Sequence, residues 1–506
     1  MIQLNLEDSN DKSNGAFYFN SEKVLCTGQI QLTDFLEKHV MNSELPDSEE
    51  IILQNINELV PYESKLSTPI YIYSKKRLVY NFLSYKNSFK EELTDQLGFQ
   101  TNISFSIKAN FNPSVLKVFH ENGSWASLVN KNELLLALKV GIKGDNLIFN
   151  GNGKKLSEID LAIKSGCYLN IDSLFNLNHT IKVAQKLYQN EDLRNKFPVK
   201  LIIRVNQTQN AQVHQYLNTS GDACKFGVQE NQVDNLIEII KSNSNLVKLS
   251  GFHSHLGSTI KAVDIYHESV KNLVNLVNMT IENHKIDSLE IINFGGGLGI
   301  NYERFASNTS KIPKVELKIP TPRDLAKVIG SHVTELKNKN IRIVVEPGRS
   351  LVGDSCILLT NLLGLKQNEN KNFLVVDSSM CECLRPCLYS AYHHIDYVKP
   401  LNQNGPRELV DVVGPVCESG DFLGKDRYLE LPLISENENA SIYLAIMDVG
   451  AYCSSMALNY NLHPKPSEVF IEEDESTNGS KSEVKYILTR RPDTLENILG
   501  SFTDFF

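Results

Sequence analysis

Short hydrophobic runs alternate with helix-length segments through the middle of the chain. In the stretch 103–109, Ile103, Phe105 and Ile107 share one face of an expected strand, while Ser104, Ser106 and Lys108 share the other. Seven similar runs follow, at 126–129, 146–150, 168–173, 200–206, 250–256, 290–295 and 341–346. Eight strands that alternate with helices predict a (β/α)8 barrel over residues 70–352, and alternation alone leaves a doubly wound open sheet as the alternative.

The pattern changes on both sides of this region. After residue 352, β-rich runs such as ELVDVVG and EVFIEE replace the long helices, so we expect a mostly-β domain over 353–506. Residues 1–69 carry short apolar patches and a helix-like LTDFLEKHV, and we expect this segment to pack with the β domain. Within it, 41–66 reads as an insertion or a surface helix, and the polar stretch 475–482 reads as a loop.

Composition narrows the class of protein. A chain of 506 residues with 41% hydrophobic and 22% charged residues predicts a globular protein of two or three domains. The formal net charge of −9 gives no support for nucleic acid or an anionic membrane as a partner. The first twenty residues are acidic and polar, and no apolar run reaches the roughly 20 residues of a membrane span, so the expected location is cytoplasmic.

Cysteine usage agrees with a reducing compartment. The chain has nine cysteines, an odd number scattered along its length, which predicts free thiols. The run Cys381-x-Cys383-x3-Cys387, followed by His393 and His394, contains residue types that bind metal ions. It lacks the paired CxxC spacing of structural zinc sites, so we predict no metal.

Several expected strands end in groups that can do chemistry. Lys108 lies near the carboxyl end of the first barrel strand. The sixth strand ends in His253-Ser254-His255-Leu256-Gly257-Ser258, the seventh in a glycine-rich run over 293–299, and the eighth in Glu346-Pro347-Gly348-Arg349. The glycine run is not a dinucleotide fingerprint, because its third glycine position holds Ile300 or Tyr302, depending on the starting glycine. Bare backbone amides after strands seven and eight are where such barrels commonly hold a phosphate. A phosphate site, a lysine and a glutamate at strand ends together indicate pyridoxal phosphate.

The chain resembles a known family in the order and content of its motifs. The matching stretches run from Lys108 to Asp493: SIKAN, GFHSHLGS, NFGGGLGI, VEPGR, LRPCLYSAYHHI, GPVCESGDFLG, GAYCSSMALNYN and RRPDT. They resemble the fold-type III decarboxylases that depend on pyridoxal phosphate, and among them the diaminopimelate decarboxylases. GPVCESGD is the most specific of these stretches.

The resemblance implies roles for individual residues. Lys108 is similar to the lysine that forms a Schiff base with the cofactor, and Cys417 to the residue that returns a proton to the substrate carbon. The remaining implied cofactor ligands are His255, Ser258, Gly297, Glu346, Pro347, Gly348, Arg349 and Tyr452. The implied substrate ligands are Arg349, Arg385, Tyr389, Glu418 and Tyr452. The family also implies a homodimer whose active sites are shared between two copies.

The sequence departs from the family after the second barrel strand. Where relatives carry Asp-x-x-Ser-Gly-Gly-Glu, this chain has Ser127-Leu128-Val129-Asn130-Lys131-Asn132-Glu133, so a carboxylate near the lysine is missing. Three alternatives stay open beside decarboxylation of meso-2,6-diaminopimelate to L-lysine. They are decarboxylation of another basic or D-configured amino acid, a racemase, which would carry tyrosine at position 417, and a catalytically dead relative that only binds partners.

Overall fold

The computed structural model describes residues 14–40, 66–207, 224–286, 289–306, 319–338, 340–401, 406–432, 441–473 and 484–502. The expected insertion at 41–66 and the expected loop at 475–482 lie outside these ranges, except for Leu66. Contacts divide the chain into two compact units. One comprises Leu78–Asn301 and Lys318–Gly353, and the other comprises Met1–Arg77, Tyr302–Leu317 and Asp354–Phe506.

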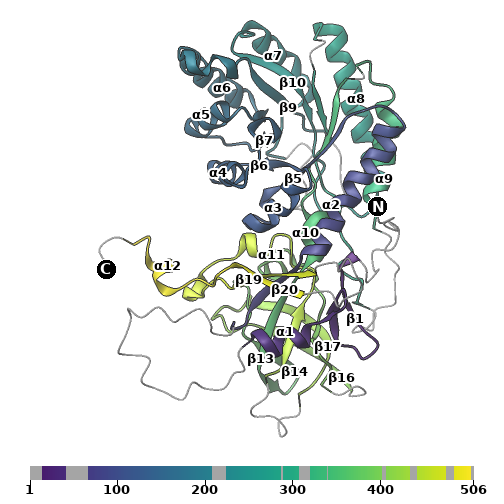
Figure 1. Ribbon diagram of the computed structural model, residues 1–506, viewed down its shortest axis with the longest axis vertical. Coiled ribbons are helices and arrows are strands. Elements are labelled where there is room, and N and C mark those ends of the chain that lie inside the picture. Colours follow the sequence, from purple (N-terminus) through teal and green to yellow (C-terminus); the bar gives the residue numbers. More distant parts are fainter. Residues whose placement is uncertain are drawn as a thin grey trace. The chain divides into compact units, whose positions relative to one another are not determined.

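The first unit is a closed barrel of parallel strands, which confirms the predicted fold class (Figure 1). Around the barrel the strands follow chain order, and β12 pairs with β5 to close it. The strands are β5 (Thr101–Ser106), β6 (Trp125–Leu128), β7 (Leu147–Phe149), β8 (Tyr168–Ile171), β9 (Val199–Arg204), β10 (Val247–His253), β11 (Ile291–Asn293) and β12 (Arg342–Val345). All eight strands predicted from alternation are present, and their ends shift by a few residues.

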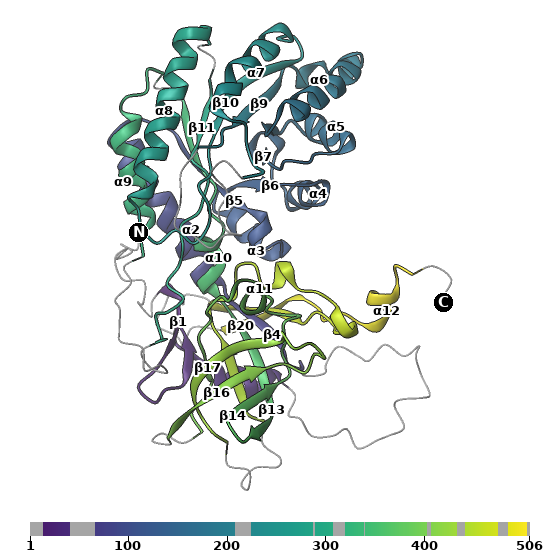
Figure 2. The ribbon, with the colours of Figure 1, turned by 180° about the vertical axis from the view of Figure 1, so that it is seen from behind.

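Helices lie outside the barrel strands in both ribbon views (Figures 1 and 2). They are α2 (Lys75–Phe89), which continues into the π-helical turn η3 (Lys90–Asp95), α3 (Pro113–Glu121), α4 (Lys131–Val140), α5 (Leu156–Ser165), α6 (Leu174–Tyr188), α7 (Glu230–Ser242), α8 (Ile265–His284) and α9 (Pro322–Val333). The short α10 (Arg349–Val352) follows β12. Short 3-10 helices include η4 (Ile107–Ala109), η5 (Gly144–Asn146), η6 (Glu191–Lys196) and η9 (Gly353–Ser355).

Local sequence explains where these helices begin and end. In α7 the buried residues Val233, Leu236, Ile237 and Ile240 recur every three or four positions, which places one apolar face against the barrel. The side chain of Asn130 accepts hydrogen bonds from the backbone of Asn132 and Glu133 and so caps the start of α4.

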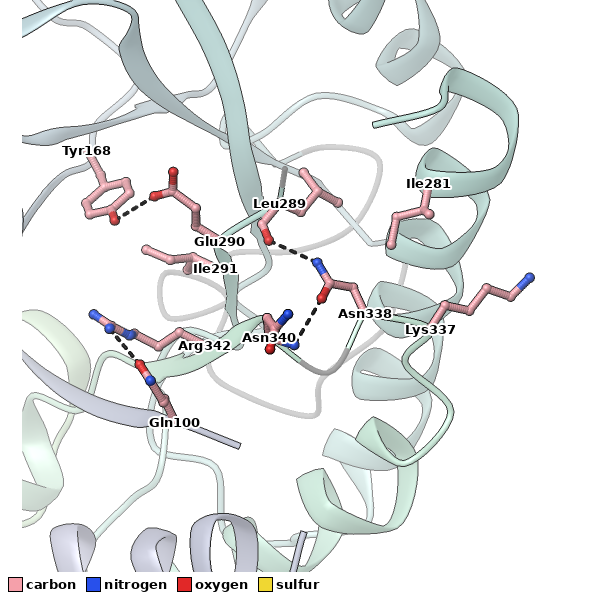
Figure 3. A pocket seen from close by; sticks show the side chains of 10 residues that line it. All are labelled: Gln100, Tyr168, Ile281, Leu289, Glu290, Ile291, Lys337, Asn338, Asn340 and Arg342. Atoms are coloured by element: carbon pink, nitrogen blue, oxygen red, sulfur yellow. Dashed lines mark hydrogen bonds between the residues drawn. The ribbon is translucent and has the colours of Figure 1, made fainter. Parts of the chain in front are cut away.

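The amino-terminal end of the barrel is closed by large side chains. A buried layer of Trp125, Ile148, Tyr168, Ile202, Ile291 and Val344 fills the barrel interior. Below it, a polar pocket of about 780 Å³ is lined by residues at the starts of β8, β11 and β12 (Figure 3). There the Tyr168 hydroxyl donates to Glu290 at 3.0 Å, and Arg342 donates to Gln100 at 2.8 Å. In (β/α)8 barrels the amino-terminal end contributes to stability, and the active site lies at the carboxyl ends of the strands.

The second unit is mostly β and includes the amino-terminal segment. A small sheet contains β1 (Phe17–Phe19), β2 (Leu25–Thr27) and β3 (Ile30–Gln31). A nine-stranded sheet contains β4 (Ile70–Ser74), β13 (Cys356–Asn368), β14 (Lys371–Val376), β15 (Ile395–Tyr397), β16 (Arg407–Val413), β17 (Phe422–Glu430), β18 (Tyr443–Ile446), β19 (Ser467–Glu473) and β20 (Val484–Arg490). Its helices are α1 (Leu32–His39), α11 (Arg385–Tyr389) and α12 (Leu495–Leu499), with 3-10 turns η10 (Ser454–Met456) and η11 (Tyr460–Leu462).

One hydrophobic core joins the amino-terminal segment to this sheet. Phe17, Leu32 and Phe35 pack in the same buried cluster as Ile357 and Leu359 of β13. The strand β4 also belongs here, because it pairs with β13 and β19 rather than with a barrel strand, although the barrel was expected to start at residue 70. None of the helices in the described part of the chain combines the length and the apolar content that a membrane crossing requires.

Candidate active site

Lys108 lies just beyond the carboxyl end of β5. The strand ends at Ser106, and Lys108 occupies the single 3-10 turn η4 that follows, with its side chain exposed. The turn is tied to the end of β12: the Ser106 backbone N–H donates to the Pro347 carbonyl at 3.0 Å, and the Ser106 hydroxyl donates to the Glu346 carbonyl at 2.9 Å. The Lys108 amine therefore lies on a turn that hydrogen bonds to the end of β12 hold in place, at the end of the barrel where active sites are found.

Glu346 is held by two asparagine side chains inside the barrel. Asn150 Nδ2 donates to both carboxylate oxygens, at 3.1 and 3.0 Å, and Asn293 Nδ2 donates to Oε1 at 2.8 Å. The carboxylate is 7% exposed. Because each amide donates to it from a fixed position, the arrangement fixes the direction in which the Glu346 carboxylate points.

Asn170 and His253 lie next to the side chains of Asn150 and Glu346. Asn170 Nδ2 donates to Asn150 Oδ1 and approaches His253 Nδ1 at 2.6 Å. An amide nitrogen can only donate, so His253 Nδ1 accepts. Burial, reinforced by the charges of Arg204 and Lys108, holds the pKa of His253 well below its usual range. His253 is therefore neutral and acts as a structural neighbour of Glu346, with 3.7 Å between His253 Nε2 and Glu346 Oε2.

The glycine-rich turn after β11 brings bare backbone against its neighbours. Gly297 has φ +116°, and a Cβ added there would lie 2.6 Å from the Gly257 carbonyl oxygen. A Cβ on Gly296 would lie 2.2 Å from the Glu346 carbonyl oxygen. Only glycine fits such a close approach, so this turn packs directly against the backbone of Gly257 and Glu346.

His255 is fixed by the same turn. The Gly296 N–H donates to His255 Nδ1 at 3.1 Å, so the ring carries its proton on Nε2. Burial, followed by the charge of Lys108, holds the pKa of His255 well below its usual range. The His255 ring is therefore neutral, and it lies with Lys108 at the carboxyl end of the barrel strands.

Ser258 and Arg349 meet beside the glycine turn. Arg349, at the start of α10, donates from Nη2 to Ser258 Oγ at 3.1 Å and is 4% exposed. Pro347 and Gly348 form the link from β12 to this helix. The barrel unit therefore brings together every predicted cofactor ligand that it contains.

These features fit a phosphorylated aldehyde cofactor. The exposed Lys108 amine can bond to an aldehyde, the Gly297 backbone with the Ser258 hydroxyl can hold a phosphate, and Glu346 offers an oriented carboxylate. The fit rests on a carboxylate that is already aimed by amides and on a turn where a Cβ would collide with the neighbouring backbone.

The departure at Ser127 leaves a hydroxyl pair in the barrel. Ser127 Oγ lies 2.7 Å from Ser104 Oγ, and both residues are buried. Nearby, Glu133 accepts from the Val129 backbone at 2.8 Å. Burial raises the pKa of Glu133, and the positive charge of Lys108 opposes this rise. Glu133 therefore interacts electrostatically with the Lys108 amine. Position 127, where the resemblance implies an aspartate, holds a serine.

The β unit contains the other predicted site residues. Arg385 starts α11, is 3% exposed, and donates from Nη1 to His393 Nε2 at 2.7 Å. Its guanidinium carbon lies 4.9 Å from the centre of the Tyr302 ring. Tyr389 ends the same helix and is half-buried.

Cys417 and Glu418 are exposed on a turn that Asp421 organises. The Asp421 carboxylate accepts from the Met380 backbone at 2.7 Å and from the Val416 backbone at 3.0 Å. The Cys417 N–H donates to Asn461 Oδ1 at 3.1 Å. This leaves the Cys417 thiol at the surface of the unit.

Tyr452 lies on a strained turn, with φ +60°. The next residue, Cys453, belongs with Cys383 and His393 to a buried group whose ligand atoms all lie within 4.8 Å of one another. His393 Nε2 in this group already accepts from Arg385, and a metal ion would face that guanidinium. We therefore interpret these side chains as packing.

Comparison with known proteins agrees with this geometry. The family model described as the pyridoxal binding domain of pyridoxal-dependent decarboxylases matches residues 83–353. A probable diaminopimelate decarboxylase of Oryza sativa subsp. japonica is 39% identical over 409 residues, which are 81% of this chain and 76% of the rice protein. The diaminopimelate decarboxylase of Aquifex aeolicus is 33% identical over 425 residues, which are 84% of this chain and 91% of the relative.

A solved structure gives the same result. The crystal structure of diaminopimelate decarboxylase from Helicobacter pylori complexed with L-lysine has a TM-score of 0.72 and 31% sequence identity, and the match covers 86% of this chain and 96% of that chain. The barrel and its site are those of a pyridoxal-dependent decarboxylase, a carboxy-lyase whose cofactor is pyridoxal phosphate. Within that class, the chain belongs to the diaminopimelate decarboxylase family.

Sequence reasoning missed the side chains that orient the predicted ones. Asn150 and Asn293 hold Glu346, and His393 holds Arg385. Their positions in the sequence could have indicated both asparagines. Asn150 directly follows β7 and Asn293 ends β11, so both lie at the carboxyl ends of strands, where such barrels have their functional groups.

Proposed function

We propose that this enzyme removes carbon dioxide from meso-2,6-diaminopimelate and releases L-lysine. The observation that carries the choice of substrate is Arg385, a buried guanidinium whose Nε has no hydrogen-bond partner among the described residues. A buried arginine with donors to spare suits a carboxylate, which can accept two parallel hydrogen bonds. Diaminopimelate keeps one carboxylate after the other has left, and Arg385 would bind the one that remains.

In the barrel, we assign each group a task toward the cofactor. Lys108 anchors it through its amine, Ser258 and the Gly297 backbone hold its phosphate, and the neutral His255 ring packs against it. Pyridoxal phosphate, when bound, supplies an electron sink for the pair of electrons that stays on the substrate carbon when carbon dioxide leaves. Glu346, aimed by Asn150 and Asn293, would offer its carboxylate to the pyridine nitrogen of the cofactor. Pro347 and Gly348 shape the backbone at this end of β12, and Arg349 orients Ser258 and faces the ligands.

In the β unit, the tasks concern the substrate. Arg385 and Tyr389 bind the carboxylate that is retained, and Glu418 binds the distal ammonium group. Cys417 donates a proton to the carbon that loses carbon dioxide. Tyr452 contacts the phosphate and the substrate. The exposure of Cys417 and Glu418 supports this assignment, because both side chains are free to reach another surface.

We propose that the enzyme is a homodimer in which Cys417 of one copy serves the barrel of the other. Exposed apolar side chains on the loops and helix starts that follow β5, β6, β7 and β8 support this assembly: Phe111, Val129, Leu156, Leu174 and Phe175. A two-fold dimer would cover two such surfaces and complete two sites through one symmetric interface. The nine cysteines, all free, support a cytoplasmic location for this dimer.

The substrate is tested by measuring carbon dioxide release from meso-diaminopimelate, L-lysine, L-ornithine and L-arginine, and L-lysine formation from meso-diaminopimelate. We expect kcat/KM for diaminopimelate to exceed that for each other substrate by about 100-fold or more, because those leave Arg385 buried without its anion. Equal turnover of lysine and diaminopimelate would instead establish a decarboxylase of broad specificity. A protein that binds pyridoxal phosphate but turns over none of the four would be a binding relative.

A further inference from the structure

His393 lies between Arg385 and the backbone that precedes Asp448. Its Nδ1 lies 2.8 Å from the Met447 carbonyl oxygen, and its Nε2 lies 2.7 Å from Arg385 Nη1. The imidazole is fully buried, with 0% of its surface exposed, and Arg385 is 3% exposed. The ring therefore bridges a fixed carbonyl and a buried guanidinium.

The two contacts define the protonation of the ring. A carbonyl oxygen only accepts, so Nδ1 carries the proton and donates to Met447. A guanidinium only donates, so Nε2 presents its lone pair to Arg385. His393 is thus neutral, and its tautomer is the one that can accept from Arg385.

Tyr302 completes the support of Arg385. The guanidinium carbon lies 4.9 Å from the Tyr302 ring centre, and the His393 and Tyr302 rings meet edge to face at 5.2 Å and 76°. Arg385 is therefore held by a hydrogen bond and by an aromatic face. Its Nε has no partner among the described residues and is left for a ligand.

We propose that His393 is a positioning residue that aims the Arg385 guanidinium at the substrate carboxylate and so sets the preference for substrates that carry this carboxylate. The inference rests on the proposed role of Arg385. Without an acceptor at His393 Nε2, the guanidinium gains a second unpaired N–H and is free to turn away from the ligand.

The test compares L-lysine with cadaverine, which differs from lysine only in lacking the carboxylate. Dissociation constants are measured on the cofactor-loaded enzyme for the wild type, His393→Phe and His393→Gln. We expect His393→Phe to weaken L-lysine binding by about 10-fold or more while cadaverine binding changes by less than about 2-fold. His393→Gln should restore most of the loss, because its Oε1 can accept from Arg385 in place of Nε2.

His394→Phe is the matched control. His394 is the adjacent residue, is also fully buried, and packs against Phe305 at 5.3 Å rather than against Arg385. This variant should lower the melting temperature without changing the ratio of lysine to cadaverine affinity.

Steady-state kinetics on diaminopimelate add a second readout. The KM of His393→Phe should rise by about 10-fold with a smaller change in kcat. The proposal is overturned if His393→Phe leaves the lysine-to-cadaverine ratio unchanged, or if the Phe and Gln variants lose the same amount. Should the wild type fail to decarboxylate diaminopimelate while the affinity ratio still shifts, the proposed function falls and the role of His393 stands.

Discussion

Glu346 shows how a single side chain is prepared for a task by its neighbours. Three hydrogen bonds from two amides fix its carboxylate, and the neutral His253 ring adds no competing positive charge. The glutamate could be predicted from its place after a strand. Its amide partners could not, because Asn150 is 196 residues away along the chain and becomes a neighbour only when the barrel closes.

Glu346→Gln tests the need for this negative charge. The new amide can keep its oxygen toward Asn150 and Asn293, so the fold and cofactor binding should be retained. The pyridine nitrogen would lose its anionic partner, and we expect kcat for diaminopimelate to fall by about 100-fold or more. Cofactor content is measured by absorbance, and kcat by carbon dioxide release.

Glu290→Gln serves as the control for charge removal from the same barrel. Glu290 lies at the opposite, amino-terminal end, where it accepts from Tyr168 at 3.0 Å (Figure 3). Its replacement should leave kcat unchanged. Wild-type turnover by Glu346→Gln would show that the electron sink does not depend on this carboxylate.

At the level of elements, the barrel strands were predictable because each is short, buried and followed by a helix. The β unit was harder to predict. The 13-residue strand β13 is buried only in its first half, and its second half is mostly exposed, so no single periodicity marks it. The strand β4 is buried at all five positions, as barrel strands are, and only its pairing with β13 and β19 assigns it to the β unit.

Lys154 ties the β7–α5 connection to β8 and α6. Its buried Nζ donates to the Gly151 and Asn170 carbonyls, both at 2.6 Å, and to Asn176 Oδ1 at 3.2 Å. Lys154→Met keeps the length of the side chain but leaves three acceptors without a donor. We expect the free energy of unfolding to fall by about 2 kcal/mol or more, measured by chemical denaturation at neutral pH.

The wild type and Lys154→Met should also differ in how their free energy of unfolding depends on pH. Burial lowers the pKa of Lys154 to about 7 from 10.5, so between these values the unfolded chain binds more protons than the folded one. Unfolding free energy should therefore rise with pH in this window, by up to about 1.4 kcal/mol per pH unit, in the wild type but not in Lys154→Met. Lys164→Met, on the exposed face of α5, is the control and should follow the wild type. Parallel curves for wild type and Lys154→Met would contradict the assigned protonation of Lys154.

At the scale of the whole molecule, the predicted site residues divide between two units. Lys108, His255 and Glu346 belong to the barrel, and Arg385 and Cys417 to the β unit. Sequence order could indicate which residues carry chemistry, but not how separate units combine, because that depends on surfaces that form only after each has folded. The proposed homodimer would bring the exposed Cys417 thiol of one copy to the barrel of the other.

Mixing two inactive variants tests this account most directly. Lys108→Ala removes the proposed anchoring amine and Cys417→Ala removes the proposed proton donor, so each variant alone should decarboxylate no diaminopimelate. After subunit exchange, about half of the dimers are mixed, and each mixed dimer has one of two sites with both residues intact. The measurement is carbon dioxide release from meso-diaminopimelate by the mixture. We predict recovery to about a quarter of wild-type activity, and no recovery despite demonstrated subunit exchange would contradict a site shared between two copies.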